Sequence, residues 1–227
     1  MDRAEQSTIR KAYRSMQDLV FETLRDEILT GKIKPGESLN TLALSKRLDV
    51  SRTPIREALN RLISIGLVEN IPYKGSIVRK LSVDEIIEIY YIRAALAGIC
   101  ARLATSRLTD MQKQRLKTLC DEMESLQASL NHNLMLEKNF EFHQIIIKAA
   151  NSPRIEALTL QFYHQSEAYR ALALELPGRY AQVCKEHREI LDSLLQGDRE
   201  KAEKSSREHQ LNTARVIAKS LGVEIEL

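Results

Sequence analysis

Residues 50–59, Val-Ser-Arg-Thr-Pro-Ile-Arg-Glu-Ala-Leu, constrain the fold of the first third of the chain more than any other stretch. Ser51 or Thr53 can cap a helix, and Pro54 suits a first helical turn, where its missing N–H costs nothing. Apolar residues then recur at helical spacing, at Ile55, Leu59, Leu62 and Ile63. The pattern predicts a helix with one packed face.

The N-terminal end of this helix is basic. Arg52 and Arg56 lie four residues apart and therefore project together, beside Ser51 and Thr53. Hydroxyl groups and N-terminal amides can bind phosphate, and arginine can reach guanine O6 and N7, so this end suits a major groove of DNA. The alternative is an ordinary solvated amphipathic helix.

The flanking segments predict a winged helix-turn-helix over residues 15–80, preceded by a flexible arm at 1–14. One apolar helix runs from Leu19 to about Leu29 and is closed by Gly31, and a shorter one covers 41–48. After the arginine helix, two short strands at 67–71 and 76–79 flank Pro-Tyr-Lys-Gly, which is a hairpin signal. This hairpin is the wing, and its tip carries Lys74 and Gly75, where a bare backbone could approach DNA.

Residues 83–221 are predicted to be almost entirely helical, after a short linker and an N-cap at Ser82. The expected helices cover 83–105, 109–130, 133–150, 153–174, 178–196 and 198–221. Helices of this length predict an antiparallel bundle deep enough to hold a cavity. The fold class is therefore mainly α, with a winged helix-turn-helix followed by an all-α bundle.

Charge is divided unevenly between these two regions. Residues 1–80 hold 15 Lys and Arg against 10 Asp and Glu, whereas the rest of the chain has a net charge of −2. A basic head on a slightly acidic body is typical of a DNA-binding domain joined to a domain of another kind. The three cysteines form no C-x-x-C pair, and neither a signal peptide nor a membrane-spanning run is evident, so we expect a reducing, cytoplasmic location.

The ordered block from Leu39 through 48–59 to Gly66, Gly75 and Val78 resembles the DNA-binding domain of GntR-family bacterial transcription regulators. The resemblance implies that Arg52 and Arg56 contact the operator, that Ser51 and Thr53 hold the DNA backbone, and that Gly75 meets DNA. Relatives often have a polar or basic residue where this chain has Leu42. A contact from that helix is therefore absent or supplied by Lys46 or Arg47.

Three of the five histidines fall on apolar helix faces of the bundle, at His143, His187 and His209. A single such histidine is usually a core imidazole bonded to a carbonyl. Three on separate helices favour a metal site, since imidazole is the commonest transition-metal ligand. Asn139 lies four residues before His143 and shares its face.

The bundle resembles the FCD domain of the FadR-like branch of the same family, over about 84–215. In metal-binding members the positions of Asn139, His143, His187 and His209 hold a divalent ion such as zinc or nickel, and a small carboxylate effector binds at the open coordination sites. Asp is commoner than Asn at the first position, so the site here keeps more positive charge. Arg93 matches a family arginine and is the candidate for the effector carboxylate, with an ordinary salt bridge as the alternative.

The resemblance implies a dimeric regulator, usually a repressor, that binds a palindromic operator in double-stranded DNA under effector control. A metal-dependent hydrolase is one alternative, because three histidines with an open position also describe a catalytic zinc. The sequence has no H-E-x-x-H pattern, phosphate loop or nucleophile motif, which argues against an enzyme. A helical adaptor that does not bind DNA would leave Arg52 and Arg56 unexplained.

Overall fold

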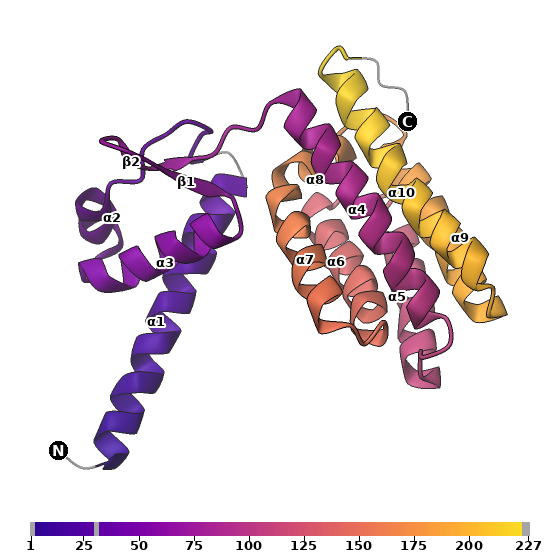
Figure 1. Cartoon of the computed structure of the whole chain (residues 1–227), viewed down its shortest axis with the longest axis horizontal. Coiled ribbons are helices and arrows are strands. Elements are labelled where there is room, and N and C mark those ends of the chain that lie inside the picture. The colour runs from indigo at the N-terminus through magenta and orange to yellow at the C-terminus, as the bar shows by residue number, and fades with distance from the viewer. Residues whose placement is uncertain (1–2, 30–31, 224–227) are drawn as a thin grey trace. The chain divides into compact units, whose positions relative to one another are not determined.

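The computed structural model describes residues 3–29 and 32–223 and divides into two compact units, at residues 1–81 and 82–227. The first unit contains α1 (Arg3–Leu29), α2 (Thr41–Leu48) and α3 (Arg52–Ser64), followed by β1 (Val68–Ile71) and β2 (Gly75–Val78) (Figure 1). The two strands pair antiparallel, from Val68 opposite Val78 to Ile71 opposite Gly75. The predicted winged helix-turn-helix is therefore present.

The core of this unit lies between α1, α3 and the hairpin. Leu24, Ile55, Ala58 and Leu62 are fully buried there, because the apolar residues of α1 and α3 recur at helical spacing and face each other. Asn40 caps α2 by accepting hydrogen bonds from the backbone N–H groups of Leu42 and Ala43. The apolar face of α3 is therefore packed against α1 and the hairpin, and its opposite face is exposed to solvent.

The second unit is built only of helices in its described part: α4 (Val83–Ala104), α5 (Asp110–Ser125), α6 (His132–Ala149), α7 (Pro153–Gln165), α8 (Glu167–Leu174), α9 (Arg179–Gln196) and α10 (Arg199–Ser220). Capping boxes begin α4, with Ser82 and Glu85, and α5, with Thr109 and Gln112. Helices α4 and α10 lie side by side along their length (Figure 1). Gly98 permits this approach, since a Cβ there would lie 3.2 Å from atoms of Glu203.

The structure differs from the sequence prediction at three places. The segment 3–14, expected to be a flexible arm, is helical in α1; it contains no Gly or Pro and several good helix formers. The single helix expected over 153–174 is two helices, which break at Ser166. The helix expected over 109–130 ends at Ser125 and continues as turns. Gly31, expected to close the first helix, lies outside the described residues.

No helix in the described part of the chain is both long and apolar enough to cross a membrane.

Candidate functional site

The N-terminal end of α3 presents its polar side chains to solvent. Arg52, Thr53 and Arg56 are exposed, whereas Ile55 beside them is completely buried. Ser51 is the N-cap residue, but its side chain makes no capping hydrogen bond. The exposed Ser51 and the first backbone amides of α3 therefore lie at a helix N-terminus that faces solvent. Such a terminus favours anions.

The wing borders the same surface. Arg52, Lys74, Gly75 and the 45% exposed Leu42 all line one surface notch between α2, α3 and the hairpin. Gly75 has a φ of +78°, and no atom in the described part of the chain lies within 4 Å of where a Cβ would stand. The backbone of the wing is therefore open to a close approach.

The two basic residues proposed to replace a contact at Leu42 have different surroundings. Lys46 is exposed. The guanidinium of Arg47 donates two hydrogen bonds to the carboxylate of Glu27, at 2.9 and 2.6 Å, and so ties α2 to α1. Lys32 binds the same carboxylate at 2.6 Å. A DNA contact by Arg47 stays a prediction. In the structure this side chain instead binds Glu27 and joins α2 to α1.

The three histidines singled out from the sequence lie together in the helical unit. His143 on α6, His187 on α9 and His209 on α10 each direct a ligand atom to a common region, and these atoms all lie within 4.8 Å of one another. The ring centroids are 4.7–5.1 Å apart. The other two histidines lie apart from this cluster: the His132 ring contacts Tyr180, and the His164 ring contacts Phe140 and Tyr163.

Hydrogen bonds on the far side of two rings define their tautomers. His187 Nδ1 lies 2.7 Å from the carbonyl oxygen of Val183, and His209 Nδ1 lies 2.7 Å from a carboxylate oxygen of Glu186. Both acceptors require a proton on Nδ1, which leaves the lone pair on Nε2. Burial and the neighbouring His209 lower the pKa of His187 to about 3, so its ring is neutral near pH 7.

Glu186 is the centre of a buried polar network that the sequence analysis did not find. Besides His209, its carboxylate accepts hydrogen bonds from Arg179 at 2.9 Å and Asn212 at 3.0 Å, and Arg179 also donates to Thr213 at 2.6 Å. Burial opposes ionisation of Glu186, but His209 and Arg179 lower its pKa to about 2. The carboxylate orients the His209 ring as outer partners of metal-binding histidines do.

The donor set fits a divalent metal ion. His143 Nε2 and His187 Nε2 are buried and have no hydrogen-bond partner among the described residues, which is costly unless something binds them. Neutral imidazoles held by outer hydrogen bonds are the form that binds zinc or nickel. Asn139 is buried and lines a cavity with His143 and His209, and its side-chain N–H lies 3.4 Å from the Tyr163 hydroxyl.

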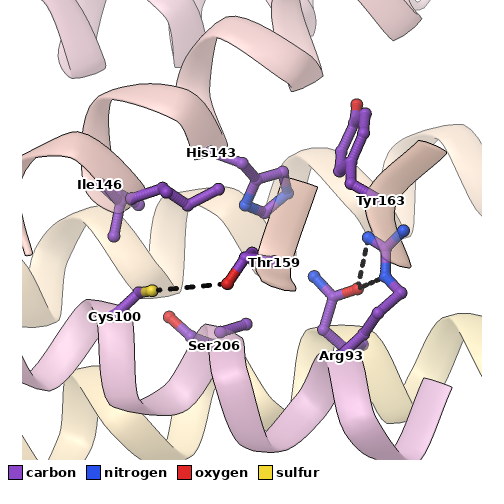
Figure 2. Close-up of a pocket in the computed structure, with 10 residues that line it drawn as sticks. Arg93, Cys100, His143, Ile146, Thr159, Tyr163 and Ser206 are labelled. Carbon is purple, nitrogen blue, oxygen red and sulfur yellow. Dashed lines mark hydrogen bonds between the residues drawn. The ribbon is translucent and has the colours of Figure 1, made fainter. Parts of the chain in front are cut away.

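Two cavities adjoin the histidines and share Arg93, His143 and Gln210. The first, of about 410 Å³ including space open to solvent, has Arg93 and Cys100 on α4 across from His143 on α6 (Figure 2). The second, of about 400 Å³ on the same basis, lies beside Asn139 and His209.

Arg93 is 5% exposed, and its side-chain hydrogen-bond partners among the described residues are Gln210 and Ser166 rather than a carboxylate, so the salt bridge expected as the alternative is not found in this part of the chain. Its Nε and Nη2 donate to Gln210 at 3.0 and 2.8 Å (Figure 2), and its Nη1 donates to Ser166. Burial and the nearby Arg170 lower the pKa of Arg93 to about 10. No periodic pattern pointed to Gln210, Ser166 or Arg170, because their roles depend on how α4, α8 and α10 pack.

The fold defines a protein with a winged-helix domain and an all-helical domain that contains two cavities, and comparisons with known proteins agree. The family model "Bacterial regulatory proteins, gntR family" matches residues 16–78, and the FCD domain matches residues 88–212. The chain belongs to the GntR family of bacterial regulatory proteins, with a C-terminal FCD domain.

The similar proteins are regulators of transcription. A "Probable D-xylose utilization operon transcriptional repressor" of Paenarthrobacter nicotinovorans is 26% identical over 81% of this chain and 80% of its own length. The "Nta operon transcriptional regulator" of Aminobacter aminovorans is 37% identical over 49% of this chain and 54% of its own length. The solved structure of Escherichia coli McbR/YncC has a TM-score of 0.78 at 22% identity, covering 91% of this chain and 98% of that one.

The family and its members confirm the predicted fold class and the reading as a DNA-binding transcription regulator rather than an enzyme.

Proposed function

We propose that this protein is a dimeric, cytoplasmic repressor whose binding to a palindromic operator is controlled by a small carboxylate in a metal-containing pocket. The observation that carries the effector part of this proposal is the convergence of three neutral histidines with two unpartnered, buried Nε2 atoms beside a cavity. A regulator that used the bundle only as a scaffold would have no need to bury such groups.

The DNA-binding part rests on exposed side chains. Arg52 and Arg56 read base edges in the major groove, Ser51 and Thr53 bind phosphate at the start of α3, and Lys74 with Gly75 approaches the adjacent backbone. Lys46 adds a phosphate contact from α2. Two such domains related by a two-fold axis would require an operator with inverted half-sites.

In the helical domain, His143, His187, His209 and Asn139 would hold zinc or nickel. When bound, the ion supplies a positive charge with open positions for a carboxylate. Arg93 lines both cavities and offers a guanidinium fork to the carboxylate. The effector then shifts the operator affinity by binding one conformation of the regulator more tightly than another.

Selection of bound sequences from random duplex DNA tests this proposal. The full-length protein should enrich an inverted repeat, and its affinity should fall steeply as salt concentration rises. Small carboxylates should change operator affinity in metal-loaded protein and lose that effect after chelation. Enrichment of no sequence would contradict the DNA-binding part, and an identical operator affinity with and without metal and carboxylates would contradict the effector part.

A further inference from the structure

Two buried arginines converge on one hydroxyl group at the break between α7 and α8. Arg93 and Arg170 are 5% and 7% exposed, and both donate a hydrogen bond to the Oγ of Ser166, which lies 2.9 Å from Arg170 Nη1. Both guanidinium groups also lie near the Tyr163 ring, Arg170 at 3.5 Å and Arg93 at 5.1 Å from its centroid. Two like charges are thus held together away from water.

No carboxylate compensates this pair among the described residues. The other hydrogen-bond acceptors of Arg93 and Arg170 are the Gln210 side-chain oxygen and the Tyr163 carbonyl, which are both neutral. Arg170 Nε is buried and has no hydrogen-bond partner in the described part of the chain. Buried charges are normally paired, so this arrangement lacks an anion.

The contrast with Arg179 supports this reading. Arg179 is also buried, and together with Arg93 and Arg170 it lines the second cavity described above. Unlike them, Arg179 donates hydrogen bonds to the Glu186 carboxylate at 2.9 Å and to Thr213 at 2.6 Å. Among the described residues, the fold therefore supplies a counterion for Arg179 and none for Arg93 and Arg170.

The arginine pair and the histidines line the same cavity. Arg93 and Arg170 border it together with Asn139, His143 and His209, and the described lining contains no Asp or Glu. Asn139 is neutral where a carboxylate would have reduced the charge of a bound ion. A ligand with one acid group could neutralise only one end of this cavity.

We propose that Arg93 and Arg170 form a second anion subsite, and that the effector is an organic dianion with two carboxylates, one at the histidine end and one at the arginine pair. The proposal rests on the proposed function and specifies the ligand of the same cavity. Arginine matches the planar carboxylate with two parallel N–H donors, and the free Nε of Arg170 is available for such a contact.

Calorimetric titration of the metal-loaded, full-length protein tests the charge of the ligand directly. The probes are malonate, succinate and glutarate, each beside its half-amide, which keeps the length and removes one charge. One dicarboxylate should bind at least about tenfold more tightly than its half-amide, because the half-amide lacks one charge-assisted contact with a buried arginine. Metal content measured after each titration controls for extraction of the ion.

Arg170→Gln should remove this difference, so that the preferred dicarboxylate and its half-amide bind with similar affinity. Arg170→Lys keeps the charge and should retain part of the preference. Arg115→Gln is the matched control, since Arg115 binds Glu141 and Glu122 and does not line either cavity; it should leave the preference unchanged. If Arg170→Gln fails to fold, the comparison of wild type with Arg170→Lys carries the test.

Equal affinity of the wild type for every dicarboxylate and its half-amide would overturn the dianion subsite while leaving a monocarboxylate effector in place. Binding of none of these probes, and of no monocarboxylate such as acetate or lactate, would overturn the proposed carboxylate effector itself. If Arg170→Gln still prefers the dicarboxylate over its half-amide, then residues other than Arg170 bind the second carboxylate, and the proposed subsite is wrong.

Discussion

The cations proposed to bind DNA lie in water, whereas those proposed to bind the effector are buried in the helical domain. Arg52, Arg56 and Lys74 are exposed, and Arg52 and Lys74 line one surface notch. In the helical domain Arg93, Arg170 and Arg179 are almost completely buried. An exposed cation keeps its hydration until DNA arrives, but a buried cation needs a partner within the fold or from a ligand. The two domains should therefore respond very differently to loss of a single charge.

The largest difference is expected between the two arginine–glutamate pairs. Glu186→Ala leaves Arg179 buried and unpaired, which should lower the free energy of unfolding by about 3–5 kcal/mol. Arg47→Ala removes a pair in which Arg47 is 40% exposed, and should cost about 0–1 kcal/mol. Urea denaturation of the metal-free variants, followed by circular dichroism, measures both. If Glu186→Ala and Arg47→Ala lower the free energy of unfolding by similar amounts, the contrast between buried and exposed cations is wrong.

Operator binding should depend on individual arginines of α3. Arg52→Ala and Arg56→Ala should each cost about 1–3 kcal/mol on the operator and much less on random DNA. Arg61→Gln is a matched control on the same helix, because Arg61 stacks on Phe21 at 4.0 Å and binds Asp18 at 2.6 Å. Fluorescence anisotropy measures the affinities. If both alanine variants bind operator as the wild type does, α3 is not the recognition helix.

Acid should destabilise the metal-free helical domain. The folded-state pKa of His187 is about 3, below the ordinary value near 6.5, so the unfolded chain binds more protons between these values. The free energy of unfolding should then fall as pH drops from about 6.5, by up to about 1.4 kcal/mol per pH unit for this group. Glu186, with its pKa of about 2, adds a loss below pH 4.5.

Urea midpoints measured at pH 7, 6 and 5 test this acid sensitivity, with His187→Gln as the variant expected to reduce the slope. All five histidines of the chain lie in residues 82–227, so the DNA-binding domain offers no such group. A midpoint that does not change between pH 7 and pH 5 would contradict the burial of a neutral His187.

The smallest expected effect concerns the wing. Lys74→Ala should weaken operator and random DNA about equally and reduce the slope of log affinity against log salt by about one, because it removes one phosphate contact. Titrations at several salt concentrations measure this slope. An unchanged slope would place Lys74 outside the interface.

The DNA-binding domain could be predicted from sequence almost completely, because its signals are local. Pro54, the apolar spacing of α3 and the hairpin turn before Gly75 each act within a few residues. The helix at residues 3–14 was missed because a polar segment without breakers has no apolar period to reveal it.

The cavity could be predicted only in part. His143, His187 and His209 were found because histidine on an apolar face is conspicuous, and the structure brings them together. Arg170 and Gln210 gave no local signal, since each joins the site through packing between helices distant in sequence. The break between α7 and α8 at Ser166 was also missed, although the Ser166 hydroxyl accepts hydrogen bonds from both Arg93 and Arg170.

Elemental analysis of the purified protein beside His187→Ala tests most directly that the buried histidines form a metal site. After exposure to zinc or nickel and removal of excess ion, the wild type should hold about one metal per chain, and the variant should hold none while still binding DNA. The absence of metal from the wild type, or an equal content in His187→Ala, would contradict the assignment.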